Sequence, residues 1–262
     1  RQSANLELDK DQLDVKNGMR KKSSEFIEKG LALYPWALLI WQWESRWCAS
    51  ENQLPPSLLH KVPLSGGGDT INEHELDPQV VCRHCRVALD IDDVERQVLE
   101  DAGEGGVQAL RTIGSQRRSR GSSGSEQDSS LGHITDIIGD RWAALVIAAA
   151  FMGLQRYDDF RRQLGIATNI LADRLKRLSE AGVFERTEYQ SNPPRSEYSL
   201  TEKGKALYPF TMTMRQWSLD WLDPMENIPF RLIHKPCGHD LVIDVACSNC
   251  GEVPKPQDVA YK

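Results

Sequence analysis

The stretch TNILADRLKRLSEA (residues 168–181) decides the fold class. Leu171, Leu175 and Leu178 recur at spacings of four and three, so they fall on one face of an α-helix and predict its core contact. Thr168 is a suitable N-cap, and Gly182 is a natural stop. The segment is therefore predicted to be an amphipathic helix with one buried side.

The residues before this segment predict further helices. Apolar periodicity indicates a short helix to Ile138, a buried helix over 141–152 and a third over 157–164. Gly153 and Gly165 supply the stops between them. The helices over 157–164 and 168–181, joined by a short turn that contains Gly165, predict a helix-turn-helix.

The residues after it predict a β-hairpin. Residues 183–189 and 196–200 alternate as strands do, and the segment 190–195 (QSNPPR) favours a turn between them. A hairpin at this place is a wing. The predicted fold class is mainly α with small β (α+β), a winged helix-turn-helix.

The outward face of the helix over 168–181 predicts DNA contacts, because a helix in the major groove presents its N-terminal outward residues to base edges. Between residues 141 and 195 there are nine Lys or Arg and six Asp or Glu, although the whole chain carries a net charge of −6. A solvated amphipathic face explains the helix alone equally well, but the adjoining wing favours DNA. The predicted base-reading residues are Thr168, Asn169 and Lys176, with Arg177 reaching phosphate and Arg195 at the wing tip. Arg174 lies nearer the apolar side, and we expect it to be structural and paired with a carboxylate.

Six separated blocks carry a family resemblance: IGDRW (138–142), YDDF (157–160), NILADRL (169–175), GVFER (182–186), PRSEY (194–198) and LTEKG (200–204). In this order they resemble the HxlR family of bacterial winged-helix regulators, over residues 131–222. The resemblance implies dimeric DNA binding, with the first helix and residues 201–222 in the dimer interface. It also implies a sensing cysteine just before the first helix, but this chain has Ser129 there.

The chain repeats itself, which predicts tandem copies. FIEKGLALYP (26–35) aligns with LTEKGKALYP (200–209), and the register continues until Trp43 meets Trp217 and His60 meets His234. VCRHC (81–85) then meets ACSNC (246–250). Each winged helix is thus predicted to be followed by a small Cys-containing, zinc-ribbon-like β element.

The repeat predicts a domain division and a role for each copy. Residues 1–94 form a degenerate winged-helix copy with a CxxC element, 95–130 a helix and flexible linker, 131–222 the DNA-binding domain and 223–262 a zinc-ribbon-like C-terminal element. Residues 5–17, which match the recognition helix, hold four acidic and two basic residues, so the first copy is predicted not to read DNA. Its helix over 28–47 is expected to pair with 199–222 as a pseudo-dimer within the chain. A homodimer in which each copy pairs with another chain is the alternative. A further helix is expected over 92–112.

The cysteines predict metal binding. Cys237, His239, Cys247 and Cys250 are expected to form a structural zinc site, against a reduced or disulfide-forming pair. In the first copy Cys82 and Cys85 form the corresponding pair, and His60, His74 or His84 could complete it. His60 and His234 are interpreted as structural histidines, and Cys48 as a small core residue.

These features favour a sequence-specific DNA-binding transcriptional regulator whose second copy reads double-stranded DNA, while the first dimerises or senses a small-molecule effector. The alternative is a protein-interaction or zinc-scaffold module that has lost DNA binding. No phosphate loop, nucleophile elbow or carboxylate pair with an evident base occurs, so an enzyme is not expected.

The longest apolar stretch, 142–152, is too short for a bilayer and no signal-peptide pattern opens the chain, so the predicted location is cytoplasmic. Because the first residue is Arg1 rather than methionine, we expect that the chain was cut or that an upstream part is missing.

Overall fold

The computed structural model describes residues 27–48, 57–63, 71–98, 134, 137–222 and 230–262. We call the described residues 27–98 the first half and the described residues 134–262 the second half. The predictions for residues 5–17, for the linker and for the short helix before residue 137 lie wholly or largely outside the described residues. No helix in the described ranges is long and apolar enough to cross a membrane.

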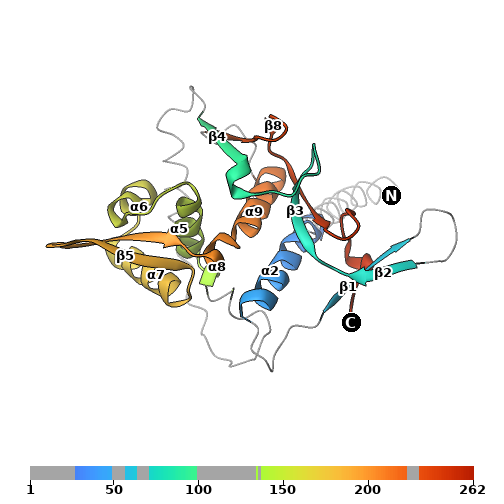
Figure 1. The fold of residues 1–262 in the computed structure, drawn as a ribbon, viewed down its shortest axis with the longest axis horizontal. Helices are drawn as coiled ribbons and strands as arrows, with labels where there is room; N and C mark the ends of the chain where they lie inside the picture. The colour runs from blue at the N-terminus through green and yellow to red at the C-terminus, as the bar shows by residue number, and fades with distance from the viewer. Residues whose placement is uncertain (1–26, 49–56, 64–70, 99–133, 135–136, 223–229) are drawn as a thin grey trace, which may run out of the picture.

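Three helices of the second half form the helix-turn-helix (Figure 1). They are α5 (Arg141–Phe151), α6 (Tyr157–Leu164) and α7 (Thr168–Glu180). The Asp140 carboxylate caps α5 by accepting from the backbone N–H groups of residues 142 and 143, and left-handed Gly165 (φ 60°) ends α6. The leucines of α7 at positions 171, 175 and 178 are at most 1% exposed, as their spacing predicted.

The predicted N-cap of α7 is wrong by one residue. Ala167 is the N-cap, with extended backbone (φ −65°, ψ 141°), and Thr168 is the first helical residue. Its carbonyl oxygen accepts a hydrogen bond from the Tyr157 hydroxyl at 2.8 Å, which ties the start of α7 to α6. Helix ends commonly shift by one or two residues, and α7 starts one residue before the predicted start.

The wing consists of β5 (Phe184–Ser191) and β6 (Pro194–Leu200), which project beyond the helices at one end of the molecule (Figure 1). The antiparallel register runs from Phe184↔Leu200 to Ser191↔Pro194, with an irregularity between positions 188 and 190. The predicted turn over 190–195 is therefore wrong, because most of that segment belongs to the strands. Pro194 is compatible with this because proline is tolerated at the first residue of a strand.

Each terminal helix is interrupted at the same place. The second half has α8 (Glu202–Lys205) and then α9 (Tyr208–Trp221), and the first half has α2 (Tyr34–Trp47) after a helical segment that ends at residue 31. Pro35 and Pro209 stand in the first turns of α2 and α9. Proline has no N–H for a helical bond to the preceding turn, so the continuous helices expected over 28–47 and 199–222 are each broken.

The terminal helices pack against each other across the two halves, and their contacts are reciprocal. Trp43 Nε1 donates to the Lys203 carbonyl at 3.2 Å, and Trp217 Nε1 donates to the Lys29 carbonyl at 3.0 Å. In the repeat, Trp43 matches Trp217 and Lys29 matches Lys203, so one contact is the counterpart of the other. The rings of α2 residue 36 and α9 residue 210, which also match, lie 4.9 Å apart between centroids.

Every sheet outside the wing contains strands of both halves. The strand orders are β10-β1-β2, β4-β7-β8 and β3-β9. The strands are β1 (Leu58–Pro63), β2 (Ile71–Glu75), β3 (Pro78–Cys82), β4 (Val94–Val98), β7 (Phe230–His234), β8 (His239–Asp240), β9 (Ile243–Cys247) and β10 (Val259–Tyr261). The 3-10 turns η1 (Ile91–Asp93) and η4 (Pro256–Asp258) precede β4 and β10.

The register of these strands repeats the symmetry of the helices. His60 pairs with Val259, and the matching His234 pairs with Val94. β3 and β9 pair about Val80↔Val245, which are themselves matching positions. The last strand of each half is therefore exchanged, and the ribbon-like elements are interleaved rather than self-contained.

The helix expected over 92–112 is wrong for residues 94–98, which form β4. The backbone of this segment pairs with β7 from Val94↔His234 to Val98↔Phe230. A free strand edge offers a row of unpaired N–H and C=O groups, and this pairing outweighs the helical preference of the segment. The remainder of the expected helix lies outside the described residues.

Candidate nucleic-acid interface and metal clusters

The five residues predicted to contact DNA are all exposed. Thr168 and Asn169 stand at the start of α7, about two turns before Lys176 and Arg177, and Arg195 lies on β6. The Lys176 and Arg177 side chains are 73% and 67% exposed. Since the leucines of α7 are buried on its opposite side, the helix is held with its polar face toward solvent.

The two exposed cations of α7 have weak partners on the same helix. Arg177 Nε lies 3.1 Å from Asp173 Oδ2, and Lys176 Nζ lies 3.7 Å from Glu180 Oε1. Exposed pairs at this spacing contribute only about 0.3–0.5 kcal/mol. Both side chains can therefore exchange a carboxylate for a phosphate at little cost.

Arg174 is structural, as predicted. Its side chain is 21% exposed, and its Nε lies 2.6 Å from Asp140 Oδ2. It also pairs with Asp173. Because Asp140 caps α5, Arg174 joins α7 to the start of α5.

Sequence reasoning missed Arg156, which positions the wing. Arg156 Nε lies 2.8 Å from Glu197 Oε1, and its guanidinium stacks 5.1 Å from the ring centroid of Tyr189. One side of the wing is thus attached to the residue before α6. The backbone N–H of Tyr198 adds a further contact by donating to the Gln155 carbonyl at 2.8 Å. No local pattern predicts this pair, because its members lie 41 positions apart.

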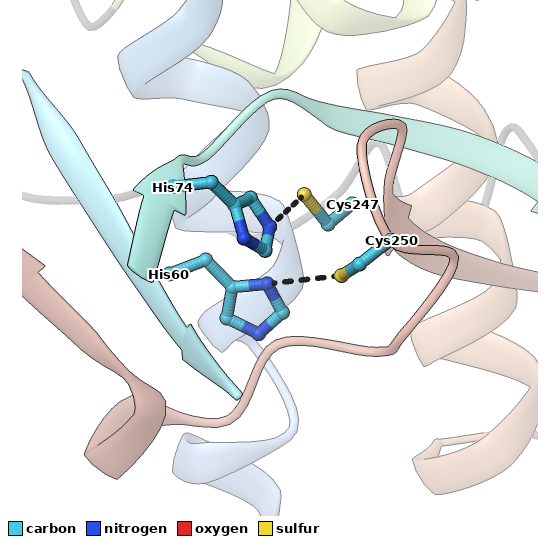
Figure 2. A group of neighbouring side chains, drawn as sticks. All are labelled: His60, His74, Cys247 and Cys250. Carbon is cyan, nitrogen blue, oxygen red and sulfur yellow. Dashed lines mark hydrogen bonds between the residues drawn. The ribbon is translucent and has the colours of Figure 1, made fainter. Parts of the chain in front are cut away.

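A first metal cluster joins two histidines of the first half to two cysteines of the second (Figure 2). His74 Nε2 lies 3.3 Å from Cys247 Sγ, and His60 Nδ1 lies 3.4 Å from Cys250 Sγ. The histidines stand on neighbouring strands, paired at His60↔His74. All four ligand atoms lie within 4.8 Å of one another and could hold a metal ion.

A second cluster joins Cys82 and Cys85 of the first half to His234 and Cys237 of the second. His234 Nδ1 lies 3.4 Å from Cys85 Sγ and 3.3 Å from Cys237 Sγ, and the sulfurs of Cys82 and Cys237 are 3.9 Å apart. These four atoms also lie within 4.8 Å of one another. All six cysteines of the chain are free thiols.

The zinc site predicted within the second half is not formed. The structure places Cys247 and Cys250 with His60 and His74, but places Cys237 with Cys82 and Cys85. His239 instead belongs to an exposed group with His84 and Cys237, where the two imidazoles stack at 3.4 Å. This arrangement has a topological cause, since strand exchange brings each CxxC pair to the histidine strand of the other half. His60 and His234, interpreted as structural histidines, are members of the clusters.

Both CxxC turns have the same backbone shape. The N–H of Cys82 donates to the Val87 carbonyl at 2.9 Å, and that of Cys247 donates to the Glu252 carbonyl at 2.8 Å. The residue after the second cysteine is left-handed in each turn: Gly251 at φ 78° and Arg86 at φ 60°. Left-handed backbone is common for glycine but rare for arginine, so the fold imposes this turn on the first half.

The comparisons with known proteins agree with this fold. The model of the family described as HxlR-like helix-turn-helix matches residues 137–226. The HTH-type transcriptional regulator Rv3095 of Mycobacterium tuberculosis is 37% identical over 123 residues, which are 47% of this chain and 78% of that protein. YvaP of Bacillus subtilis, also an HTH-type transcriptional regulator, is 39% identical over 90 residues, 34% of this chain and 83% of YvaP.

Among solved structures, the reduced form of the transcriptional regulator YodB from B. subtilis is 28% identical, and the match covers 37% of this chain and 97% of YodB with a TM-score of 0.33. The described helices and wing define a winged helix-turn-helix protein. The chain belongs to the HxlR-like helix-turn-helix family.

Proposed function

We propose that this protein is a sequence-specific DNA-binding transcriptional regulator, with α7 in the major groove and the wing on the adjacent backbone. The observation that carries the proposal is the exposed polar face of α7. Three buried leucines on the opposite side of α7 keep this face toward solvent, and the wing lies beside it. Its relatives named as transcriptional regulators support the same function.

Each exposed residue has a role suited to its chemistry. The Asn169 amide can donate to and accept from an adenine edge, and Lys176 can donate to guanine. Thr168 stands at the helix start, where side chains reach base edges first. Arg177 and Arg195 lie further toward the flanks, where they would contact phosphate and set the register without reading sequence.

The first half has a supporting role in this proposal. Through α2 it packs on α9 with reciprocal tryptophan contacts, so one chain supplies the paired terminal helices of a dimer. That arrangement leaves the reading of DNA to the second half, consistent with the acidic character of residues 5–17. The alternatives for the first half are pairing with a second chain and sensing of a small-molecule effector.

The proposal includes structural zinc as the cofactor and the cytoplasm as the compartment. Reduced thiols are the form that binds metal, and the cytoplasm keeps them reduced.

The test is a gel shift against a sequence selected from a random library by the purified protein. The Lys176→Ala, Arg195→Ala double variant should lose specific binding, whereas a Lys205→Ala, Arg231→Ala variant, which loses the same charge elsewhere, should retain it. Arg177→Ala should lower the slope of log K against log salt by about 0.9, the value for one lost phosphate contact. Failure to select any sequence, with no binding at low ionic strength, would instead favour a protein-interaction or zinc-scaffold module.

A further inference from the structure

We infer that the chain binds two structural Zn²⁺ ions and that each ion is coordinated by both halves. One ion is held by His60, His74, Cys247 and Cys250, and the other by Cys82, Cys85, His234 and Cys237. The inference rests on the zinc cofactor proposed above and does not depend on DNA binding.

The distances in both clusters fit the edges of a tetrahedron around zinc. Bonds of about 2.3 Å to sulfur and about 2.0–2.1 Å to nitrogen give S···N edges of about 3.5 Å and S···S edges of about 3.8 Å. S···N distances of 3.3 and 3.4 Å occur in each cluster, and the sulfurs of Cys82 and Cys237 lie 3.9 Å apart. These five distances are therefore those expected between ligands of a tetrahedral ion.

Ordinary hydrogen bonding explains the second cluster less well than a metal does. His234 Nδ1 approaches two sulfurs at once, those of Cys85 and Cys237. A single ring nitrogen can share only one proton with its neighbours, so two thiols at this distance are not both satisfied by it. A metal bound to Nδ1 satisfies that nitrogen and both sulfurs together.

The donor sets and their burial indicate zinc in a structural role. Two histidines with two cysteines, and three cysteines with one histidine, are common structural zinc sets. Cys82 and Cys247 are 0% exposed, and His60 and His234 are at most 1% exposed. Since four protein ligands fill a tetrahedron, neither site leaves a position for a reacting water.

Because each ion has ligands from both halves, the ions link the two halves to each other. Each cluster takes one CxxC turn from one half and a histidine strand from the other. Neither set is complete unless β3 has paired with β9 and the terminal strands have exchanged. The free energy of metal binding then stabilises the association of the two halves.

The experiment counts zinc per chain by mass spectrometry of the metal in the purified full-length protein, and wild type should contain two ions. The Cys237→Ser, Cys250→Ser double variant should contain none, because these cysteines belong to different sites. The Cys85→Ser, His234→Ala double variant should retain one ion, because both residues belong to one site. Cys48→Ser and His239→Ala, whose residues lie outside the two sets, should each retain two.

A site confined to the second half predicts the opposite pattern. Cys237→Ser with Cys250→Ser would then remove a single ion, and His239→Ala would remove that ion as well. Either of these results, or fewer than two ions in wild type, would overturn the inference.

Cobalt substitution of the wild-type chain provides a readout that does not require a variant to fold. The absorption of thiolate-bound cobalt grows with the number of cobalt–sulfur bonds, and the two sites together have five thiolates. Two cobalt ions should bind, with tetrahedral spectra and a thiolate band equivalent to five bonds. Octahedral spectra, or a band equivalent to three bonds or fewer, would contradict the assignment. A chain that holds both ions but ignores DNA would disprove the proposed function alone.

Discussion

Replacing Trp43 by alanine tests whether the first half is part of the core of the winged helix. Trp43 is 4% exposed and belongs to one apolar cluster with the leucines of α7 and Phe184 of the wing. Its indole N–H donates to the Lys203 carbonyl, and the Lys203 ammonium lies 5.2 Å from the ring centroid. A side chain of the first half thus fills the core of the second.

The expected cost follows from this burial. Truncation of a buried tryptophan to alanine costs about 3–5 kcal/mol, and the carbonyl left without its donor places Trp43→Ala near the upper end, at about 4–5 kcal/mol. Trp217→Ala is the matched control, because the equivalent indole donates to the Lys29 carbonyl but is only half-buried. We expect the control to cost about 2–3 kcal/mol.

Urea unfolding followed by circular dichroism measures the difference. With an m-value of about 3 kcal/mol/M, Trp43→Ala should lower the unfolding midpoint by about 1.5 M, clearly more than Trp217→Ala. A loss below about 1 kcal/mol, or equal losses for the two variants, would mean that α2 does not complete this core. The two halves would then be joined through their shared sheets and not through this core.

Three further substitutions each have an expected effect on stability, which is compared with that of a control. Gly204→Ala places a Cβ against a backbone carbonyl oxygen and should destabilise the protein by about 2–3 kcal/mol in urea unfolding, whereas Gly30→Ala, at the matching position, meets no atom within 4 Å and should cost less than about 0.5 kcal/mol. Arg174→Ala removes the ion pair to the cap of α5 and should cost about 1–2 kcal/mol, against less than about 0.5 kcal/mol for exposed Arg177→Ala; equal losses would contradict the structural role. Burial raises the pKa of Tyr208 from 10.0 to about 12. The unfolded chain ionises first, so this contribution to stability is complete below pH 10 and is lost between pH 10 and 12. Tyr208→Phe should lack that part of the pH dependence in parallel urea titrations, and identical profiles would refute it.

The winged helix was predictable because its signals are local. The spacing of Leu171, Leu175 and Leu178 requires a helix with one buried side, and glycines at 153 and 165 mark the ends of its neighbours. Even the partnership of Arg174 could be expected, since an arginine near an apolar face requires a carboxylate. The predictions that were wrong concerned boundaries: α7 starts one residue earlier, and the wing strands extend further into the predicted turn.

The exchanged strands and the metal clusters were not predictable in the same way. Sequence distance favours Cys237 as the partner of Cys247 and Cys250, yet strand pairing places them in different clusters. β4 prefers β7 over a helical continuation because of an edge that exists only in the assembled fold. One signal was available, since His60 and His234 coincide in the repeat, and so do the two CxxC pairs. A recurrent histidine beside a recurrent cysteine pair is more informative than either alone.

The two clusters differ in one ligand, and the difference has a local cause. In the first, His74 comes from the strand that pairs with His60, and the corresponding position beside His234 is His239. His239 nevertheless stacks on His84, while Cys237, from the tight turn that joins β7 to β8, takes the fourth place. In a homodimer of identical subunits, the two-fold axis would force both sites to share one ligand set. Two halves in one chain are free of that constraint, so each can keep its own donors while the exchanged strands preserve the geometry.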